Sequence, residues 1–347
     1  MADITFSCWI NAWSIDKGLR QLGGRKLKTT KTGGIVPEIT SEPQNGDSLF
    51  FTDEASMSEH VGLQNYHYYP KELPEEVFDD KLAFAKLAET LEIPTIPSQP
   101  IPEEKDHLPF PKLVKARNSW KNGKHVHRGW VCESAGDFPD IYSKIMEKGF
   151  TPNDYFLQDW LENLDAEDNF SVCGFWDAKE NDRNLLAVVQ RTSSYNKGQS
   201  CSSAVAVIKD PGGLIGWTRR ILNYLSYQGP FEIEYIRTSN GFKVLELNPR
   251  FWYQNGIFLK HDNGLIKRYV DEETKPPRGG IVIDRGTWVD GVWLIRSILK
   301  FQFRAIRESR RAAKLGRAKV ELFPTLPVIL KYFAGRVFRK KLTSGND

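Results

Sequence analysis

The sequence predicts a mixed α/β fold, and three observations support this prediction. Apolar residues make up 40% of the 347 residues and aromatic residues 12%, which is enough to fill hydrophobic cores and argues against disorder. Short apolar runs typical of strands alternate along the chain with segments of helical periodicity. The length corresponds to two or three folding units, so we expect more than one domain.

The first unit is expected over residues 1–75. The run DITFSCW, residues 3–9, predicts a strand, and residues 15–24 predict a helix closed by a pair of glycines. A second strand is expected over 47–54, after a loop rich in Gly, Pro, Ser and Thr. These elements form a small α/β unit at the start of the chain.

The second unit is expected over residues 76–285, with a small lobe at about 108–158. It begins with a helix that Asp79 or Asp80 can cap and that Pro94 ends. The elements expected next are two paired strands, a helix and a third strand, at 109–115, 126–134, 136–150 and 154–162. After these we expect two strands, a helix and a β-hairpin, at 169–177, 184–194, 213–229 and 231–250.

The second strand of the hairpin, KVLELNPRFW, places Glu246, Asn248 and Arg250 on one face, because side chains alternate along a strand. A two-residue turn at Asn240-Gly241 would put the acids of the two strands on opposite faces. A three-residue loop with a left-handed Gly241 would instead pair Glu234 with Glu246 and Glu232 with Asn248. We favour this second register because it alone separates a polar face from an apolar one, which consists of Phe231, Ile233, Tyr235, Leu245 and Leu247.

The favoured register gathers three carboxylates, an amide and a guanidinium on one patch. Carboxylates this close raise each other's pKa unless a positive group lies between them. A divalent cation with oxygen ligands, such as Mg²⁺, fits this requirement. The other interpretation of the hairpin alone is an exposed charged face on an edge of the sheet.

The run from Asp80 to about Gly256 resembles the ATP-grasp superfamily, and most closely its carboxylate–amine ligase branch. The resemblance rests on the strand motif acid-x-Asn-Pro-Arg, which is ELNPR here, and on the order of the other parts. It implies that Glu246 and Asn248 hold Mg²⁺, with Mn²⁺ as a possible substitute. The third ligand would come from the preceding strand, and Glu234 is preferred over Glu232.

The resemblance also implies positions that contact ATP. Lys81 stands where the family begins this domain with an Asp-Lys pair, and Lys115 ends a strand, as does the family's phosphate-binding lysine. The motif LQDWLE resembles the hinge between the lobes, where main-chain groups bind adenine; it contributes Gln158, Asp159 and Leu161.

Three further positions are expected to bind nucleotide or phosphate. Asp168 lies where an acid commonly binds the ribose, with Glu167 as a rival. Many family members have a Gly-rich loop over the phosphates, but the corresponding loop here is basic, so Lys124 would supply charge in place of backbone N–H groups. Arg191 would bind a phosphate or a substrate carboxylate.

The activity that the resemblance implies is ATP-dependent ligation. ATP would convert a carboxylate into an acyl phosphate, releasing ADP, and an amine would then displace phosphate. Lys115 and Arg250 would be the catalytic residues. Another acyl-phosphate enzyme, such as an ATP-dependent carboxylating enzyme, is one alternative, and a non-catalytic nucleotide-binding scaffold on a membrane is another.

The last segment, residues 286–347, is expected to be helical and basic. One helix is predicted over 289–320, with apolar positions at Val292, Leu294, Ile295, Ile298, Phe301, Phe303 and Ile306. Thirteen Lys and Arg and two acids give residues 300–341 a net charge of +11, so the remainder carries about −7 of the total of +4. This segment either docks on the catalytic body or makes peripheral contact with an anionic membrane.

The sequence also suggests where the protein acts. Its N-terminus lacks the pattern of a signal peptide, and no apolar run reaches the roughly 18 residues that a membrane-spanning helix needs. The four cysteines are widely spaced without a CxxC pair, which favours reduced thiols. We therefore expect a cytoplasmic protein that binds no nucleic acid, with association to the inner face of the membrane as the alternative that the basic segment leaves open. Its oligomeric state is left open.

Overall fold

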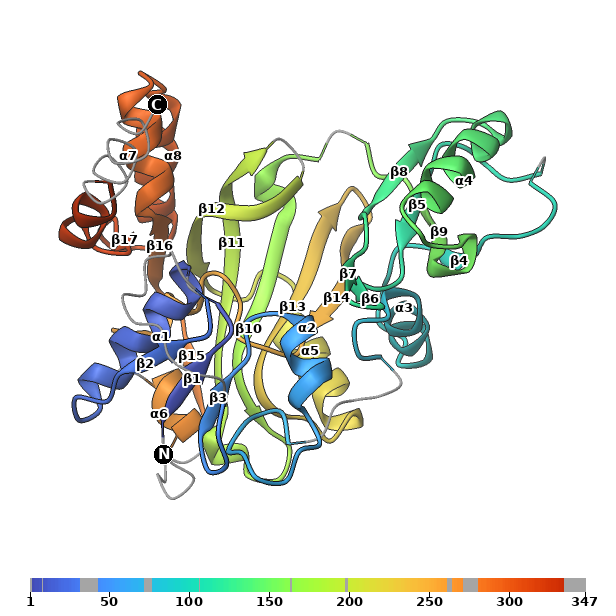
Figure 1. The fold of residues 1–347 in the computed structure, drawn as a ribbon. Coiled ribbons are helices and arrows are strands. Elements are labelled where there is room, and N and C mark those ends of the chain that lie inside the picture. Colours follow the sequence, from blue (N-terminus) through green and yellow to red (C-terminus); the bar gives the residue numbers. More distant parts are fainter. Residues whose placement is uncertain are drawn as a thin grey trace, which may run out of the picture.

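The structure is a computed structural model, and the residues that it describes are 2–7, 9–31, 43–71, 77–105, 107–162, 164–196, 199–260, 264–270 and 280–333. The chain forms a small N-terminal sheet, a projecting small lobe, a large twisted sheet and a C-terminal group of helices (Figure 1). The predicted mixed α/β fold is therefore correct. The proposed domain limits at residues 75 and 285 stay predictions.

The N-terminal sheet is parallel and has the strand order β2-β1-β3, with β1 at Asp3–Thr5, β2 at Leu27–Thr29 and β3 at Ser48–Phe50. Helix α1 (Ile10–Gln21) begins earlier than expected and ends before the glycine pair. The end of the expected strand at 47–54 is instead the start of helix α2 (Glu54–His60). Asp53 caps α2 by accepting a hydrogen bond from the Ser56 amide at 2.9 Å, which explains the change from strand to helix.

The small lobe is a four-stranded antiparallel sheet of order β4-β9-β5-β8 with one helix packed on it. Its buried core includes Val114 of β5 and Ile141 and Ile145 of α4. The predicted strands and helix of this lobe are confirmed. Its elements are β4 (Ser98–Pro100), β5 (Lys112–Ala116), β6 (Trp120–Lys121), β7 (Lys124–His125), β8 (Gly129–Cys132), η1 (Ala135–Asp137), α4 (Phe138–Glu147), η2 (Pro152–Asp154) and β9 (Tyr155–Asp159).

The described part of the large sheet has eight strands, in the order β14-β13-β10-β11-β12-β16-β17 with β15 alongside β11. These are β10 (Asn169–Asp177), β11 (Leu185–Asn196), β12 (Gln199–Ile208), β13 (Gln228–Thr238), β14 (Gly241–Asn248), β15 (Ile281–Ile283), β16 (Gly286–Asp290) and β17 (Leu322–Phe323). The short 3₁₀ helices beside them are η3 (Ala166–Asp168), η4 (Asn181–Arg183) and η5 (Asn255–Phe258).

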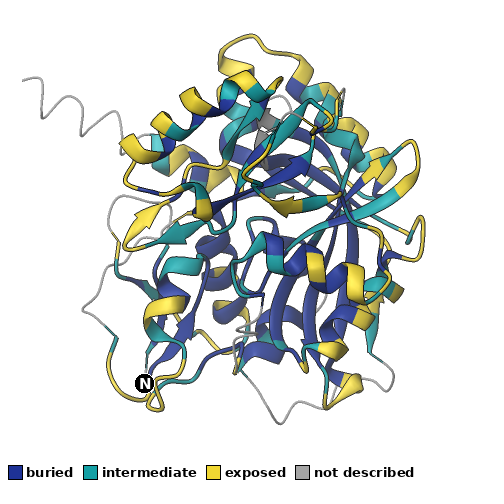
Figure 2. Cartoon of the chain, turned by 90° about the vertical axis from the view of Figure 1, so that its right-hand side faces the viewer, coloured by how far each residue is buried: buried dark blue, intermediate teal, exposed yellow. Residues whose placement is uncertain are grey.

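Both faces of the large sheet are covered by helices. Helices α3 (Lys81–Thr90) and α5 (Leu214–Tyr224) pack on one face, and α1 and α6 (Gly264–Val270) on the other. Strand β11 therefore carries apolar side chains toward both sides: Leu186 faces α5, and Leu185 faces α6. Buried residues are accordingly concentrated in the sheet, and exposed residues lie on the outer helix surfaces (Figure 2).

Strand β12 was not expected from the sequence, in which no strand was predicted between residue 194 and the helix at 213. The segment is a long strand paired with β11 and β16. Its first half, QSCSS, is small and polar, so it lacks the apolar alternation that identifies a strand. Pairing on both edges satisfies its backbone groups and decides its conformation.

The hairpin β13–β14 has the predicted pairs but a different turn. Glu234 pairs with Glu246 and Glu232 with Asn248, as expected. The ladder begins at Thr238 opposite Gly241, so the loop has two residues, and a register shift just after Glu234 leaves Leu245 as an extra residue. The prediction of a three-residue loop was wrong: a β-bulge restores the register instead. The bulge also places Val244, rather than Leu245, in the core beside Tyr235.

The predicted single helix over 289–320 was wrong. Helix α7 (Gly291–Leu299) and helix α8 (Arg304–Leu315) are separated by a sharp turn at residues 300–303. The turn allows both helices to pack against the sheet, since Leu294 of α7 and Ala305 and Ala312 of α8 share one small core with Ala204 and Val289. One straight helix could not place both stripes on the same surface. Among the described residues, none of the helices is sufficiently long and apolar to cross a bilayer.

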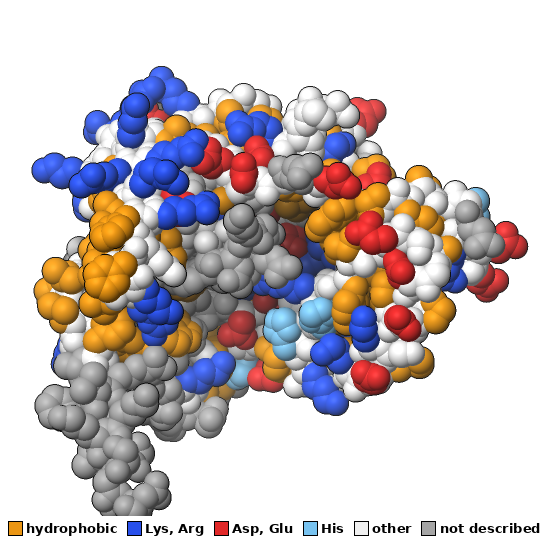
Figure 3. All heavy atoms as spheres, turned by 90° about the horizontal axis from the view of Figure 1, so that it is seen from above, with side chains coloured by type: hydrophobic (Ala, Val, Ile, Leu, Met, Phe, Trp, Pro, Cys, Tyr) orange, Lys and Arg blue, Asp and Glu red, His pale blue; other side chains and the backbone are white. Residues whose placement is uncertain are grey.

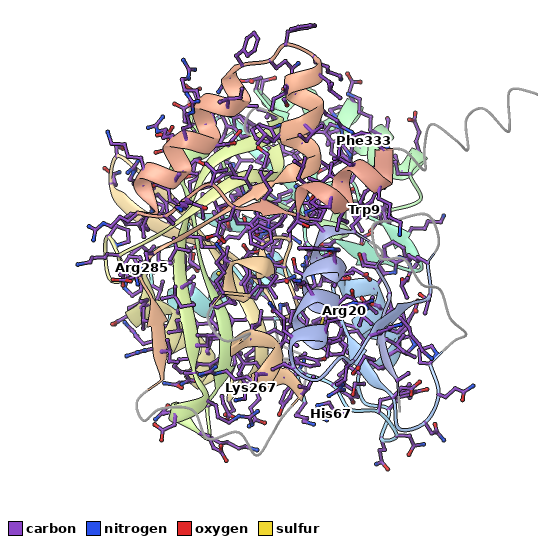
Figure 4. The ribbon with its side chains drawn as sticks, turned by 90° about the vertical axis from the view of Figure 1, so that its left-hand side faces the viewer. Trp9, Arg20, His67, Lys267, Arg285 and Phe333 are labelled. Carbon is purple, nitrogen blue, oxygen red and sulfur yellow. The ribbon has the colours of Figure 1, made fainter. Side chains whose placement is uncertain are left out.

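Residues 326–333 form a further helical stretch that returns to the start of α1. Ile329 is fully buried in the main core. Trp9 and Phe333 lie close together in Figure 4, and the rings of Trp9 and Tyr332 meet edge-on with centroids 6.1 Å apart. This part of the predicted apolar-basic segment is therefore docked on the body of the protein.

Asp290 caps helix α7 and titrates abnormally. Its fully buried carboxylate accepts hydrogen bonds from the Trp293 amide at 2.9 Å and from the Tyr253 hydroxyl at 3.0 Å. Burial raises the pKa of Asp290 from 3.8 to about 7. The folded protein therefore holds a proton between these two pH values that the unfolded chain releases, so the group lowers stability as pH rises through this window.

We expect Asp290→Asn to remove this dependence. Asparagine keeps the oxygen that caps the helix but carries no charge, so at pH 8 the variant should be more stable than the unmodified protein, by on the order of 1–4 kcal/mol. At pH 4 the two should be similar. Urea unfolding at both pH values measures the difference, with the exposed Asp284→Asn as the control. An equal loss of stability at both pH values would contradict the assignment.

Candidate active site

The polar face of the β13–β14 hairpin forms the centre of the candidate site. Glu232 and Asn248 are buried, and Glu234 and Glu246 are half-buried. The Asn248 amide nitrogen donates to Glu232 at 3.3 Å and, at the limit of hydrogen bonding, to Glu234 at 3.5 Å. The alternative of a fully exposed charged edge is therefore excluded, because this face is largely removed from water.

Two lysines from other elements meet the hairpin. Lys81, at the start of α3, lies 3.9 Å from a Glu246 carboxylate oxygen and donates to the Ser119 hydroxyl at 2.9 Å. Lys115, on β5 of the small lobe, donates to Gln158 at 3.3 Å, and its charge acts on Glu246 and Glu234. Helix α3 and the small lobe thus place cations on the acids of the large sheet.

The electrostatics divide the three acids into two groups. Burial and then the Glu234 charge raise the pKa of Glu232 to about 8. Burial and the Glu246 charge also raise the pKa of Glu234. Burial acts in the same direction on Glu246, but the charges of Lys81 and Lys115, joined by those of Arg128 and Arg250, outweigh it and hold the pKa of Glu246 below its usual range. Glu246 is therefore the stable anion of the patch.

Desolvation also affects the lysine. It lowers the pKa of Lys115, and the nearby Lys81 acts in the same direction, whereas Glu246 opposes both. Lys115 is thus a partly desolvated cation next to the acids of the hairpin. Such a group is well suited to binding an anion that enters together with a metal ion.

Arg250 is held by the N-terminal unit. Its Nε donates to Glu54 of α2 at 2.6 Å, and a second nitrogen lies 3.5 Å from the Asn248 side-chain oxygen. Burial lowers the pKa of Arg250, but the Glu54 charge and hydrogen bond outweigh this effect and raise it. The guanidinium is thus a permanent cation whose orientation depends on α2.

The patch is open at one edge of α3. A cavity of about 10 Å³, room for about one water molecule, lies between α3 and β14. Its walls are Val77, Asp79, Asp80, Lys81, Phe84, Glu246, Leu247 and Asn248. Figure 3 shows a wider hollow beside the small lobe, with side chains of both charges at its bottom.

No family model matches the sequence, and no curated protein matches it. Solved structures do match. The N5-carboxyaminoimidazole synthase of Aspergillus clavatus, solved with ADP and 5-aminoimidazole ribonucleotide, aligns over 81% of this chain and 79% of its own, with a TM-score of 0.54 and 10% identity.

Two bacterial enzymes align similarly. The N5-carboxyaminoimidazole synthetase of Staphylococcus aureus covers 77% of both chains with a TM-score of 0.53 and 12% identity. The biotin carboxylase domain of the Hydrogenobacter thermophilus 2-oxoglutarate carboxylase, solved with MgADP, ADP and bicarbonate, covers 79% of this chain and 70% of its own, with a TM-score of 0.54 and 12% identity. The chain has the ATP-grasp fold. At these identities the likeness establishes the fold and not the substrate.

Two of the other residues predicted to bind nucleotide, Gln158 and Arg191, lie close to the central acids. Gln158 is buried and bridges Lys115 to Ser98, donating to the Ser98 hydroxyl at 3.1 Å. Arg191 donates to Ser202 at 2.8 Å, and its charge acts on Glu232 and Glu234. Both therefore lie with the central patch.

Four predicted residues lie away from the acids or already have partners. The Asp159 side chain forms an ion pair with Lys112, and its amide donates to the Pro97 carbonyl at 3.0 Å. Asp168 pairs with Arg237 at 3.0 Å. Lys124 is exposed on β7, and Leu161 is half-buried just after β9. Their roles toward a nucleotide stay predictions.

The predicted metal ligands fit a hard cation only if other groups complete its coordination shell. Within the described part of the chain, no three His, Cys, Asp or Glu side chains are grouped closely enough to hold a metal ion by themselves. Mg²⁺, however, usually takes only one or two carboxylates, together with waters and substrate phosphates. Glu234, whose pKa is raised, and the ionised Glu246, together with the Asn248 amide oxygen, form a donor set of this kind.

Two participants, Glu54 and Asp79, were missed by the sequence analysis as site residues. Glu54 reaches Arg250 from nearly 200 residues away in the chain, and no local pattern signals such a contact. Asp79 accepts hydrogen bonds from the amides of Ser119 and Trp120, which ties the start of α3 to the basic loop. Arg128 of this basic loop also acts on the site, because its charge lowers the pKa of Glu246.

Proposed function

We propose that this protein is an ATP-dependent ligase that activates a carboxylate as an acyl phosphate and joins it to an amine, releasing ADP and phosphate. One observation carries the proposal: the small lobe and α3 direct Lys115 and Lys81 onto the acid Glu246 of the large sheet. In an ATP-grasp fold, the lysines at this junction between the lobes would neutralise the phosphates of ATP, and the acids would hold the metal ion.

Lys115 would hold phosphate oxygens of ATP, and Lys81 would orient Glu246. The adenine edge would meet the hinge after β9 through the Asp159 carbonyl and the Leu161 amide, since the Asp159 amide is engaged by Pro97. Glu234, Glu246 and Asn248 would hold Mg²⁺, or Mn²⁺ in its place. Such a cation would neutralise charge at the phosphates. It would also offset the repulsion between the Glu234 and Glu246 carboxylates.

The chemistry follows from these positions. A substrate carboxylate oxygen attacks the γ-phosphorus, the bond to ADP breaks, and an acyl phosphate forms. The amine nitrogen then attacks the acyl carbon, and phosphate leaves with its bonding electron pair while the amine loses a proton. Arg250 would face the transferring phosphoryl group and then the tetrahedral oxyanion, and Glu54 keeps the guanidinium in position.

Carboxylation is the second candidate function. The aligned structures include N5-carboxyaminoimidazole synthetases and a biotin carboxylase domain solved with bicarbonate, so a bicarbonate substrate is compatible with this fold. The carboxylate to be activated would then be bicarbonate, and the same residues would act on carboxyphosphate. We also propose that the protein works in the cytoplasm, where ATP is available and where buried free thiols such as Cys132 and Cys173 stay reduced.

Release of ADP tests both candidates. Purified protein with ATP and Mg²⁺ is screened against pairs of carboxylates and amines, with bicarbonate among the carboxylates. ADP formation that requires both a carboxylate and an amine supports the ligase, and formation that requires bicarbonate supports carboxylation. Glu246→Gln controls for contaminating ATPase activity. Absence of ATP binding by calorimetry would contradict both.

A further inference from the structure

The turn between α7 and α8 exposes a run of large apolar side chains. We call the residues Ile298–Arg304 the hairpin tip, and every one of them is exposed. The exposed fractions are 80% for Phe301, 69% for Leu299 and 64% for Phe303. Two aromatic rings and a leucine so close together, each mostly in water, are unusual for a surface that has no partner.

The fold itself does not require these side chains. Helix α7 is buried through residues such as Val292, Leu294 and Ser297, and α8 through Ala305, Ser309 and Ala312. The tip contributes nothing to that packing. The buried core would be unchanged if Phe301 and Phe303 were polar, so their apolar character has another cause.

The backbone at Phe301 supports this conclusion. Helix α7 ends with hydrogen bonds from Phe301 N to Ile298 O at 2.9 Å and from Gln302 N to Ser297 O at 2.8 Å, the pattern in which glycine normally takes the left-handed position. Phe301 occupies that position with φ of +57°. A bulky residue is strained there, whereas glycine would be relaxed. Stability would thus favour glycine at the place where the chain carries an exposed ring.

The charge around the tip has one sign. Arg296, Lys300, Arg304 and Arg307 are all exposed, and Glu308 is the one acid in the sequence from 291 to 315. Glu308 is already engaged, since it pairs with Arg304 and accepts a hydrogen bond from Ser193. Figure 3 shows hydrophobic and Lys or Arg side chains side by side over the C-terminal helices.

We propose that the hairpin tip is a peripheral membrane anchor, in which Phe301, Phe303 and Leu299 enter the headgroup region of a bilayer rich in anionic lipid while the surrounding cations bind its phosphates. Apolar side chains ringed by Lys and Arg match the two components of such a surface. A second copy of the chain is a poorer match, because the same cations would face one another. The stretch 326–333 also exposes Leu326 and Leu330, but Ile329 fixes it in the core and its exposed leucines are less exposed than Phe301, Leu299 and Phe303.

Vesicle sedimentation tests the proposal on the full-length protein. We expect binding to phosphatidylcholine vesicles containing about a third phosphatidylglycerol, at least about tenfold weaker binding to pure phosphatidylcholine, and weakening by salt. Phe301→Gly combined with Phe303→Ser should reduce binding to anionic vesicles at least about tenfold. Phe301→Gly alone should reduce binding while leaving the unfolding midpoint unchanged or higher, so unfolding cannot explain the loss.

Matched controls separate the anchor from general stickiness. Met146 and Tyr224 are also more than half exposed but lie elsewhere in the fold, so Met146→Ser and Tyr224→Ser should bind as the unmodified protein does. Charge reversal at Lys300 and Arg307 should abolish the preference for anionic vesicles. Equal sedimentation with both kinds of vesicle, or binding that the phenylalanine substitutions leave unchanged, would overturn the proposal. Self-association that Phe301→Gly abolishes, without vesicle binding, would assign the tip to a second copy instead.

Discussion

Glu246→Gln is expected to lower ATP turnover on the order of 10²–10³-fold, the usual cost of removing one preorganised charged group from an active site. Glutamine has nearly the same size but loses the negative charge that Lys81 and Lys115 stabilise. The two lysines would then repel a divalent cation that Glu246 otherwise attracts. Measurement of ADP release at saturating ATP and Mg²⁺ gives the effect on kcat.

The control for this substitution is Glu89→Gln, an exposed acid of α3 that should have no effect on turnover. Circular dichroism and the unfolding midpoint must show that Glu246→Gln remains folded. Turnover equal to that of the unmodified protein would remove Glu246 from the metal site. A large loss of turnover with unchanged dependence on Mg²⁺ concentration would also contradict its role as a ligand.

Lys115→Met is expected to weaken ATP binding about 10- to 150-fold, which corresponds to the roughly 1.5–3 kcal/mol typical of a hydrogen bond to a charged group. Methionine retains most of the side-chain volume, so the effect should come from the lost charge. The substitution also removes the hydrogen bond to Gln158, which we expect to be minor because this bond is long, at 3.3 Å. Calorimetry with ATP and Mg²⁺ measures the change.

Lys86→Met provides the matched control, because Lys86 is exposed on α3. Gln158→Leu, which removes only the lysine's neutral partner, should weaken ATP binding far less than Lys115→Met. Unchanged affinity in Lys115→Met would exclude phosphate binding by this residue. If ATP binding fell while ADP binding did not, Lys115 would contact the γ-phosphate rather than the inner phosphates.

Much of the candidate site could be predicted because its chemistry is local in the chain. The alternation of Glu246, Asn248 and Arg250 requires one shared face of a strand, whatever surrounds it. The need to keep acids out of the core then selects the pairs Glu234–Glu246 and Glu232–Asn248, which the structure confirms. Lys115 was selected as a candidate because a cation at the end of an apolar strand is better suited to a ligand than to a core.

The errors occurred where two local solutions satisfy the same requirement. A three-residue loop and a bulge at Leu245 both restore the register, and only packing chooses between Leu245 and Val244 for the core. Similarly, residues 289–320 have helical periodicity throughout, yet the positions of β12 and β16 require a turn at 300–303. Sequence periodicity shows which face of a helix or strand is apolar, but it does not show which other elements pack against that face.

The sequence by itself therefore determined the mixed α/β class, the ATP-grasp resemblance and the acids of the hairpin, because strand alternation and burial act over neighbouring residues. The tertiary structure alone decided that Glu54 orients Arg250, that Lys81 reaches Glu246, and that Phe301 stands exposed at a turn. These contacts join residues far apart in the chain, and their geometry depends on how whole elements pack. Electrostatic pairing across that packing, rather than any local motif, makes Glu246 the stable anion of the site.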